Sequence, residues 1–185
     1  MTMQKKSIWP IVRIVVFALL LAVFFRSYLF ASYVVNGKSM EPTLHDGNLL
    51  MVNKMIYDLK AIDRFDVIVF HANEKEDYVK RVIGQPGDHI AYKDDVLYIN
   101  GEEVEESYLA QYRIPGEILT EDFTLEEVTN EKVVPEGKLF VLGDNRKKSY
   151  DSREIGFVDQ ETVVGKVDIR YWPMSEINFQ FINLN

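Results

Sequence analysis

The chain has 185 residues, enough for one domain with a sizeable hydrophobic core. Hydrophobic residues make up 47% and aromatic residues 12%, which argues against global disorder. With no cysteine, thiol catalysis, disulfides and thiolate metal sites are excluded. The net charge is −8, and because residues 1–26 carry four basic and no acidic side chains (+4), the remainder carries −12. Such an acidic body does not suit nucleic-acid binding, and no nucleic-acid partner is expected.

A long apolar run lies near the start of the chain. Residues Ile14–Phe25 read IVVFALLLAVFF, and the eighteen positions from Ile8 to Phe25 contain a single charge, Arg13. A helix that crosses a bilayer needs about 20 mostly apolar residues. The run predicts a single-pass transmembrane helix over residues 8–26. A cleaved secretory signal would end in small residues at a cut site, whereas bulky residues follow this run. A buried core helix is the other alternative, but a run that is apolar on every side suits lipid better.

The flanking charges predict how the anchor is oriented. Lys5 and Lys6 precede the run, which favours residues 1–7 in the cytoplasm. Residues 27–185 would then form an extracytoplasmic domain attached to the cell membrane, and the lipid bilayer would be one partner of the chain.

The body beyond the anchor is strand-like. Asn100-Gly101 is a strong hairpin signal, because both residues accept positive φ, and Gln85–Asp88 reads QPGD, typical of a tight turn. No helix of three turns is expected after the anchor. The pattern predicts a mainly β, antiparallel sheet or barrel-like domain. Its expected strands are the short β-branched or aromatic runs at 31–37, 48–54, 65–71, 78–84, 89–95, 96–104, 138–144 and 165–173.

One region differs in composition from the rest of the body. Residues 102–131 contain ten acidic side chains and a single basic one, Arg113. The segment is expected to be an irregular, solvated insertion on the β domain. A docking surface for a basic partner is the alternative.

Ser39, in the segment NGKSMEPTLHDGN at 36–48, is the first candidate for chemistry. A Ser-His-Asp triad requires a histidine. His45 lies in a DG turn, His71 ends a strand and His89 follows a PGD turn, and none has a distinctive setting. They also lack metal-ligand spacing, so neither a metal nor another cofactor is expected.

Lys80 is the second candidate, because it interrupts the apolar strand YVKRVIG at 78–84. A lysine has an ordinary pKa of about 10.4 and is charged at neutral pH. Burial disfavours the charge and lowers the pKa, which would create a general base where no histidine serves. The alternative is an ordinary strand-edge lysine that pairs with an acid.

The third candidate cluster follows the strand at 138–144. The segment GDNRKKSYDSR at 143–153 concentrates charged and hydroxyl side chains directly after an apolar run. It is either a polar loop with its own charge network or a set of groups that orients a catalytic residue.

Together these segments resemble the type I signal peptidases, membrane-anchored serine proteases that remove signal peptides from exported proteins. The resemblance rests on GKSMEPTL at 37–44, KRVIGQPGD at 80–88 and GDNRKKSYDSR at 143–153, in the family's order after an apolar N-terminal segment. The single anchor and the small size look like the Gram-positive branch. The resemblance implies a hydrolase whose partners are preproteins with signal peptides.

The resemblance also assigns roles. Ser39 matches the nucleophile and Lys80 the general base of a Ser–Lys dyad, a variant of the triad. Ser149 matches a serine whose hydroxyl helps to position the lysine. Four further residues match polar groups that support the site: Arg81, Asp144, Asp151 and Arg153.

The family's oxyanion and specificity sites map less completely. The backbone N–H of Ser39 matches an oxyanion donor, while Gly37 stands where some members have a second donor, a serine hydroxyl. Family members prefer small residues, typically alanine, at the first and third positions before the cut. The matching pocket positions are Tyr33, Val35, Leu44 and Val79.

Two other functions remain alternatives. One is a catalytically silent, anchored β domain that binds proteins outside the cell. The other is a self-cleaving Ser–Lys regulator resembling the SOS repressors. The apolar N-terminal run and the acidic body argue against the second, because such regulators are cytoplasmic and usually carry a DNA-binding region.

Overall fold

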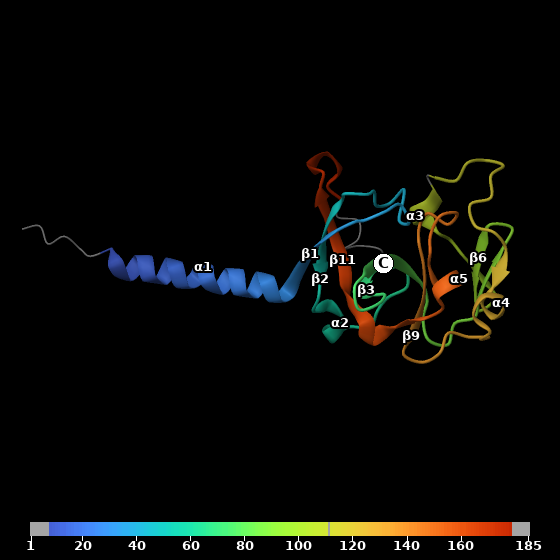
Figure 1. Cartoon of the computed structure of the whole chain (residues 1–185), viewed down its shortest axis with the longest axis horizontal. Coiled ribbons are helices and arrows are strands. Elements are labelled where there is room, and N and C mark those ends of the chain that lie inside the picture. Colours follow the sequence, from blue (N-terminus) through green and yellow to red (C-terminus); the bar gives the residue numbers. More distant parts are fainter. Residues whose placement is uncertain (1–7, 111, 179–185) are drawn as a thin grey trace, which may run out of the picture.

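The computed structural model describes residues 8–110 and 112–178. Helix α1 (Trp9–Leu29) projects from a β body along the long axis of the molecule (Figure 1). Over the described residues, no helix meets the length and hydropathy needed to cross a membrane. The segment predicted to be cytoplasmic, 1–7, lies outside the described residues.

The larger of two sheets has seven antiparallel strands. Their spatial order is β1-β2-β11-β3-β4-β9-β10, so β11, at the end of the described chain, lies between β2 and β3. The strands are β1 (Phe30–Val34), β2 (Leu49–Asn53), β3 (Val67–His71), β4 (Asp77–Gly84), β9 (Lys138–Leu142), β10 (Val158–Asp159) and β11 (Val163–Trp172).

The smaller sheet has the order β7-β6-β5-β8 and lies at the end of the β body opposite α1 (Figure 1). Its strands are β5 (Ile90–Lys93), β6 (Val96–Ile99), β7 (Glu102–Val104) and β8 (Phe123–Thr124). Short helices connect the strands: α2 (Ile56–Leu59), α3 (Ser107–Ala110), α4 (Leu125–Thr129), α5 (Ser152–Ile155) and the 3-10 turn η1 (Gln160–Thr162). A second 3-10 turn, η2 (Met174–Glu176), follows β11.

These elements confirm the predicted fold class. Each of the eight expected segments contains a strand, and no described helix after α1 exceeds five residues. Asn100 and Gly101 have φ of 54° and 85° and join β6 to β7. In the QPGD turn, Gly87 has φ of 86° and Asp88 N–H donates to Gln85 O at 3.0 Å. The turns were predictable because positive φ strongly favours glycine and asparagine.

The acidic segment 102–131 differs from its prediction. It is not an irregular insertion throughout, because it contributes β7, α3, β8 and α4, and β7 and β8 form the two edges of the smaller sheet. Composition alone could not reveal these elements. The outward side chains of an edge strand can be acidic while its backbone forms the hydrogen bonds that join it to the sheet.

Strand β4 is covered on both faces, which determines the setting of the site. Val82 packs with Ile68 and Phe70, whereas Ile83 packs with Ile90 and other residues of the smaller sheet. A strand covered on both faces buries successive side chains rather than alternate ones. Lys80 and Arg81 are therefore both buried.

Candidate active site

Ser39 and Lys80 meet at one point in the structure. Ser39 lies in the loop between β1 and β2, and Lys80 lies in β4. Lys80 Nζ donates to Ser39 Oγ at 2.7 Å, across 41 positions of sequence. Within the described residues no histidine bonds to Ser39, and His71 instead contacts Asp77 at 2.6 Å. The hydroxyl thus has an amine as its neighbour.

The pair opens into a cleft of about 260 Å³. Tyr33, Val35 and Val79, three of the four positions that the resemblance assigned to a substrate pocket, line it. Leu44 does not: it is fully buried in the core with Val35, because its loop turns inward after Ser39. The cleft is therefore walled by β1, the Ser39 loop and the start of β4.

The environment of Lys80 favours the neutral amine. The residue is only 4% exposed. Burial lowers the pKa of Lys80 to about 8, although the charges of Asp151 and Asp144 act to raise it. An amine with this pKa is partly neutral near pH 7 and can accept a proton.

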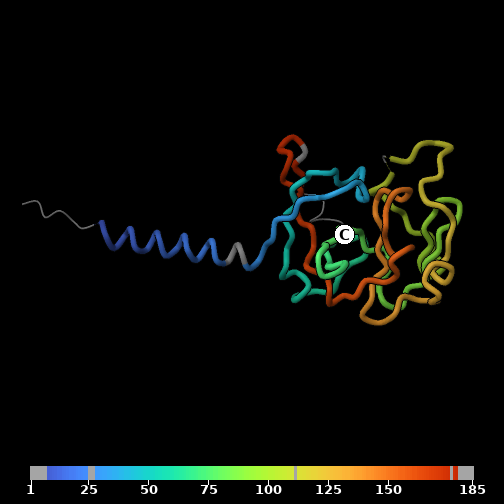
Figure 2. Tube along the Cα trace, in the orientation of Figure 1, coloured from blue at the N-terminus to red at the C-terminus, as the bar shows by residue number. Residues whose placement is uncertain are grey.

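The backbone of Ser39 is held by the loop that follows β9, as the adjacent traces in Figure 2 show. Asn145 N–H donates to Ser39 O and its side-chain amide donates to Lys38 O, both at 3.0 Å. Gly143 also lies close, because a Cβ there would collide with Ser39 O and with Ser149 Oγ. Only glycine permits this approach of the two segments.

The Ser149 hydroxyl is buried beside this contact. Among the described residues it has no hydrogen-bond partner, so the structure does not join it to Lys80. An unsatisfied buried hydroxyl costs about 1–3 kcal/mol. Ser149 thus keeps an unused donor and acceptor close to the Ser39 backbone.

Gly37 does not offer a free oxyanion donor. It has φ of 92°, and its N–H donates to Asp46 Oδ1 at 2.7 Å. By contrast, no described residue accepts a hydrogen bond from Ser39 N–H. The Ser39 backbone N–H is therefore available to an incoming oxygen.

The four residues predicted to support the site form two ion pairs, of which Arg81–Asp144 is buried and Arg153–Asp151 is partly buried. Arg81 donates to Asp144 through two nitrogens, at 2.9 and 2.6 Å. Arg153 donates to both oxygens of Asp151 at 2.9 Å, and Asp151 also accepts from Gly143 N–H. Such two-pronged pairs fix orientation as well as distance.

A further buried network, centred on Arg146 and Glu106, was not predicted. Arg146 Nη2 donates to Glu106 at 2.5 Å, and Arg146 Nε donates to Gly143 O at 3.0 Å. Tyr92 and Tyr108 also donate to Glu106, at 2.8 and 2.6 Å. The network ties the smaller sheet to the loop that holds Ser39. Nothing local distinguishes Glu106 from the neighbouring acids, so no sequence signal could have found it.

The chain is similar to known proteins over almost its whole length. The chain matches the family described as "Signal peptidase, peptidase S26" over residues 8–172. It is 57% identical to Signal peptidase I of Bacillus caldolyticus, over 98% of this chain and 100% of that one. It is 42% identical to Signal peptidase IB of Staphylococcus aureus (strain MRSA252), over 97% of this chain and 96% of the relative.

A solved structure shares the fold. The crystal structure of a signal peptidase I from Enterococcus faecalis V583 is 47% identical and matches with a TM-score of 0.55. The match covers 58% of this chain and 97% of that one. The length and identity of these matches show that the chain belongs to the signal peptidase family, peptidase S26, as its motifs predicted.

Proposed function

We propose that this chain is a membrane-anchored serine endopeptidase that removes N-terminal signal peptides from exported preproteins by means of a Ser39–Lys80 dyad. The observation that carries the proposal is the 2.7 Å hydrogen bond between Lys80 Nζ and Ser39 Oγ at the cleft. Family membership supports the reaction class.

The first half of the reaction uses Lys80 as a base and then as an acid. Neutral Lys80 accepts the Ser39 proton as Oγ attacks the scissile carbonyl carbon. The tetrahedral intermediate collapses and the C–N bond breaks. The proton on Lys80 passes to the leaving amine, which is the new N-terminus of the mature protein. The signal peptide remains attached to Ser39 as an ester.

Water completes the cycle. Lys80, neutral again, takes a proton from a water molecule that attacks the ester carbonyl. The Ser39–acyl bond breaks, the proton returns to Ser39 Oγ, and the signal peptide leaves with a free carboxylate. Each half therefore returns Lys80 to the neutral form in which it began.

The groups around the dyad orient it and stabilise charge. Ser39 N–H is free to donate to the oxyanion. The unused hydroxyl of Ser149 is proposed to orient the Lys80 amine when substrate fills the cleft. Arg81, Asp144, Asp151 and Arg153 hold the surrounding backbone and do not take part in proton transfer.

The cleft suits a substrate bound as an extended strand. In a strand, alternate side chains point the same way, so two pockets can read the first and third residues before the cut. Tyr33, Val35 and Val79 line the wall that would receive them. The preference for alanine at these two positions is what membership of the family implies.

The anchor brings enzyme and substrate to the same place. We propose that residues 8–26 span the membrane, with residues 1–7 in the cytoplasm and residues 27–185 outside it. Support comes from the apolar run Ile14–Phe25 and from the exposed hydrophobic side chains along α1. Because β1 follows α1 directly, the cleft would lie close to the bilayer from which a signal peptide emerges.

Detergent-solubilised protein incubated with a preprotein whose signal ends in Ala-x-Ala tests the function. We expect cleavage after the second alanine, seen by mass spectrometry of the new N-terminus, and complete loss of cleavage in Ser39→Ala. No cleavage by the wild type, or equal cleavage by Ser39→Ala, would favour the alternative of a silent binding domain.

The rate should depend on pH through Lys80. Because the charged amine cannot accept a proton, kcat/KM should rise about tenfold per pH unit at low pH and level off above the Lys80 pKa of about 8. The groups that face this amine are the carboxylates of Asp144 and Asp151 and the ring of Tyr78, 5.3 Å away. A rate that stays flat from about pH 6 to about pH 9 would contradict a titrating base in this range.

A further inference from the structure

Two cations line the cleft beside the dyad. Lys38 directly precedes Ser39, and Lys148 directly precedes Ser149; both are exposed, and both border the cleft. Neither forms an ion pair with any residue that the structure describes, whereas the adjacent Lys147 lies 3.8 Å from Glu117. Asp77, the one acid among the described residues that line the cleft, lies 2.6 Å from His71 and offsets only part of this positive charge. The cleft therefore presents unneutralised positive charge.

The two lysines are held in place together by Asn145. The side-chain amide of Asn145 donates to Lys38 O at 3.0 Å, and the backbone carbonyl oxygen of Asn145 accepts from Lys148 N–H at 2.9 Å. Its own N–H donates to Ser39 O. The backbones that carry the two cations are thus fixed relative to the nucleophile, while their long side chains remain free to reach a substrate.

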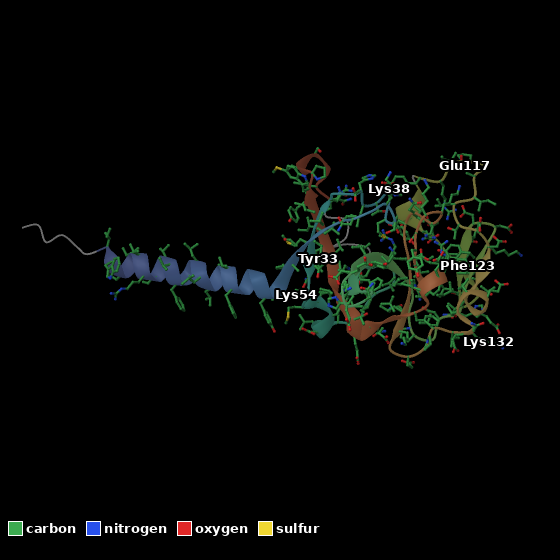
Figure 3. All side chains as sticks on the ribbon, viewed as in Figure 1. Tyr33, Lys38, Lys54, Glu117, Phe123 and Lys132 are labelled. Carbon is green, nitrogen blue, oxygen red and sulfur yellow. The ribbon has the colours of Figure 1, made fainter. Side chains whose placement is uncertain are left out.

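The position of Lys38 indicates which part of a substrate it would meet. Tyr33 lies near the end of α1, and Lys38 lies farther from that helix (Figure 3). A substrate that enters from the membrane side would place its signal residues along Tyr33, Val35 and Val79. The residues after the cut would then pass beyond Ser39, toward Lys38.

The negative charge of the rest of the domain makes the two lysines a distinct place for an acidic substrate residue. Outside residues 1–26 the chain carries −12, so an acidic substrate segment is generally repelled from the body. Unpaired cations at the cleft reverse that repulsion locally. Exposed charge pairs are individually weak and screened by salt. We therefore expect a modest preference for acidic substrate residues, which weakens as the ionic strength rises.

We propose that Lys38 and Lys148 form a subsite for an acidic side chain in the first two residues of the mature protein. The inference rests on the proposed function and adds a substrate class to it: preproteins with Asp or Glu just after the cut. The lysines act on binding and take no part in proton transfer.

The test compares preproteins that differ only in the first two mature residues. Three substrates share an Ala-x-Ala signal and carry Asp, Asn or Lys at both of these positions. We expect the wild type to cleave the Asp substrate about threefold to tenfold more efficiently, by kcat/KM, than the Asn substrate at about 50 mM NaCl. The preference should shrink toward onefold at about 500 mM NaCl, and the Lys substrate should be the poorest.

Charge reversal provides the matched comparison. K38E/K148E should prefer the Lys substrate over the Asp substrate. Substitution of Lys38, the neighbour of Ser39, can lower activity toward every substrate, and the ratio of kcat/KM for the two substrates cancels such a general loss. K93E/K132E alters the net charge equally at two exposed lysines outside the cleft and should keep the wild-type preference. Equal kcat/KM for Asp and Asn in the wild type, or the same preference in K38E/K148E, would overturn the subsite.

Two further outcomes separate the subsite from the proposed function. Cleavage of the Asn substrate without any Asp preference leaves the peptidase assignment intact and refutes the subsite alone. A fourth substrate carries Asp in the signal peptide just before the cut. If Asp raises kcat/KM over Asn only at that position, the subsite is also refuted. Failure of the wild type to cleave all three substrates refutes the proposed function and the subsite with it.

Discussion

Lys80→Arg is expected to reduce kcat/KM by about 10²–10⁴-fold at every pH at which the protein is folded, because general-base catalysis contributes that much and arginine cannot deprotonate in a protein. The substitution keeps the positive charge, so charge alone cannot rescue activity. The measurement is cleavage of an Ala-x-Ala preprotein across the pH range. Turnover within tenfold of the wild type would rule out Lys80 as the base.

Lys80→Met separates catalysis from folding in the same experiment. The pKa of Lys80 falls from 10.5 to about 8 in the folded chain, so below pH 8 the fold bears the cost of a buried charge, about 3 kcal/mol. That cost declines as the pH rises from about 8 and is nearly gone above 10.5. We therefore expect the inactive Lys80→Met variant to unfold at a higher temperature than the wild type at pH 7, with a gap that narrows in alkali. A lower melting temperature at pH 7 would mean that Lys80 stabilises the fold.

Glu106→Gln is expected to cause the largest loss of stability, about 3–5 kcal/mol in the free energy of unfolding. The change preserves the shape of the side chain but removes its negative charge. In the wild type that charge neutralises Arg146, which is 2% exposed, and it also faces Arg113, whose Nη2 lies 3.5 Å from Glu106 Oε2. An uncompensated buried cation is costly, because the interior cannot solvate it. Urea unfolding of the detergent-solubilised chain, followed by circular dichroism, measures the loss.

Glu105→Gln is the matched control, because Glu105 is the exposed neighbour in the same acidic segment. It should change stability by less than about 0.5 kcal/mol. Equal effects of the two substitutions would contradict a special role for Glu106. Activity should also fall more in Glu106→Gln, since Arg146 holds Gly143 O and the adjoining Asn145 holds Ser39 O.

The β class was accessible from the sequence because its signals are local. Strand alternation and apolar runs lie within a few residues of one another, and turn residues such as Asn100-Gly101 report the backbone angles that they adopt. The motifs around Ser39 and Lys80 likewise identified the family before any geometry was known. The roles assigned to individual site residues rest on that resemblance and remain proposals.

The sequence by itself could not separate residues that look alike locally but differ in burial. Leu44 resembles a pocket residue, yet it lies in the core, and Glu106 resembles its acidic neighbours, yet it is buried against Arg146. Ser149 matches the family's lysine-positioning serine in sequence, but its hydroxyl forms no hydrogen bond to Lys80 among the described residues.

The sequence therefore determined the strands, the turns and the family, because each depends on neighbouring residues or on a continuous motif. Only the tertiary structure decided that Lys80, 41 positions from Ser39, reaches its hydroxyl at 2.7 Å and has a lowered pKa. The physical reason is that desolvation depends on everything packed around a group. Both faces of β4 must be covered by other parts of the fold before the pKa of a lysine at that position is lowered.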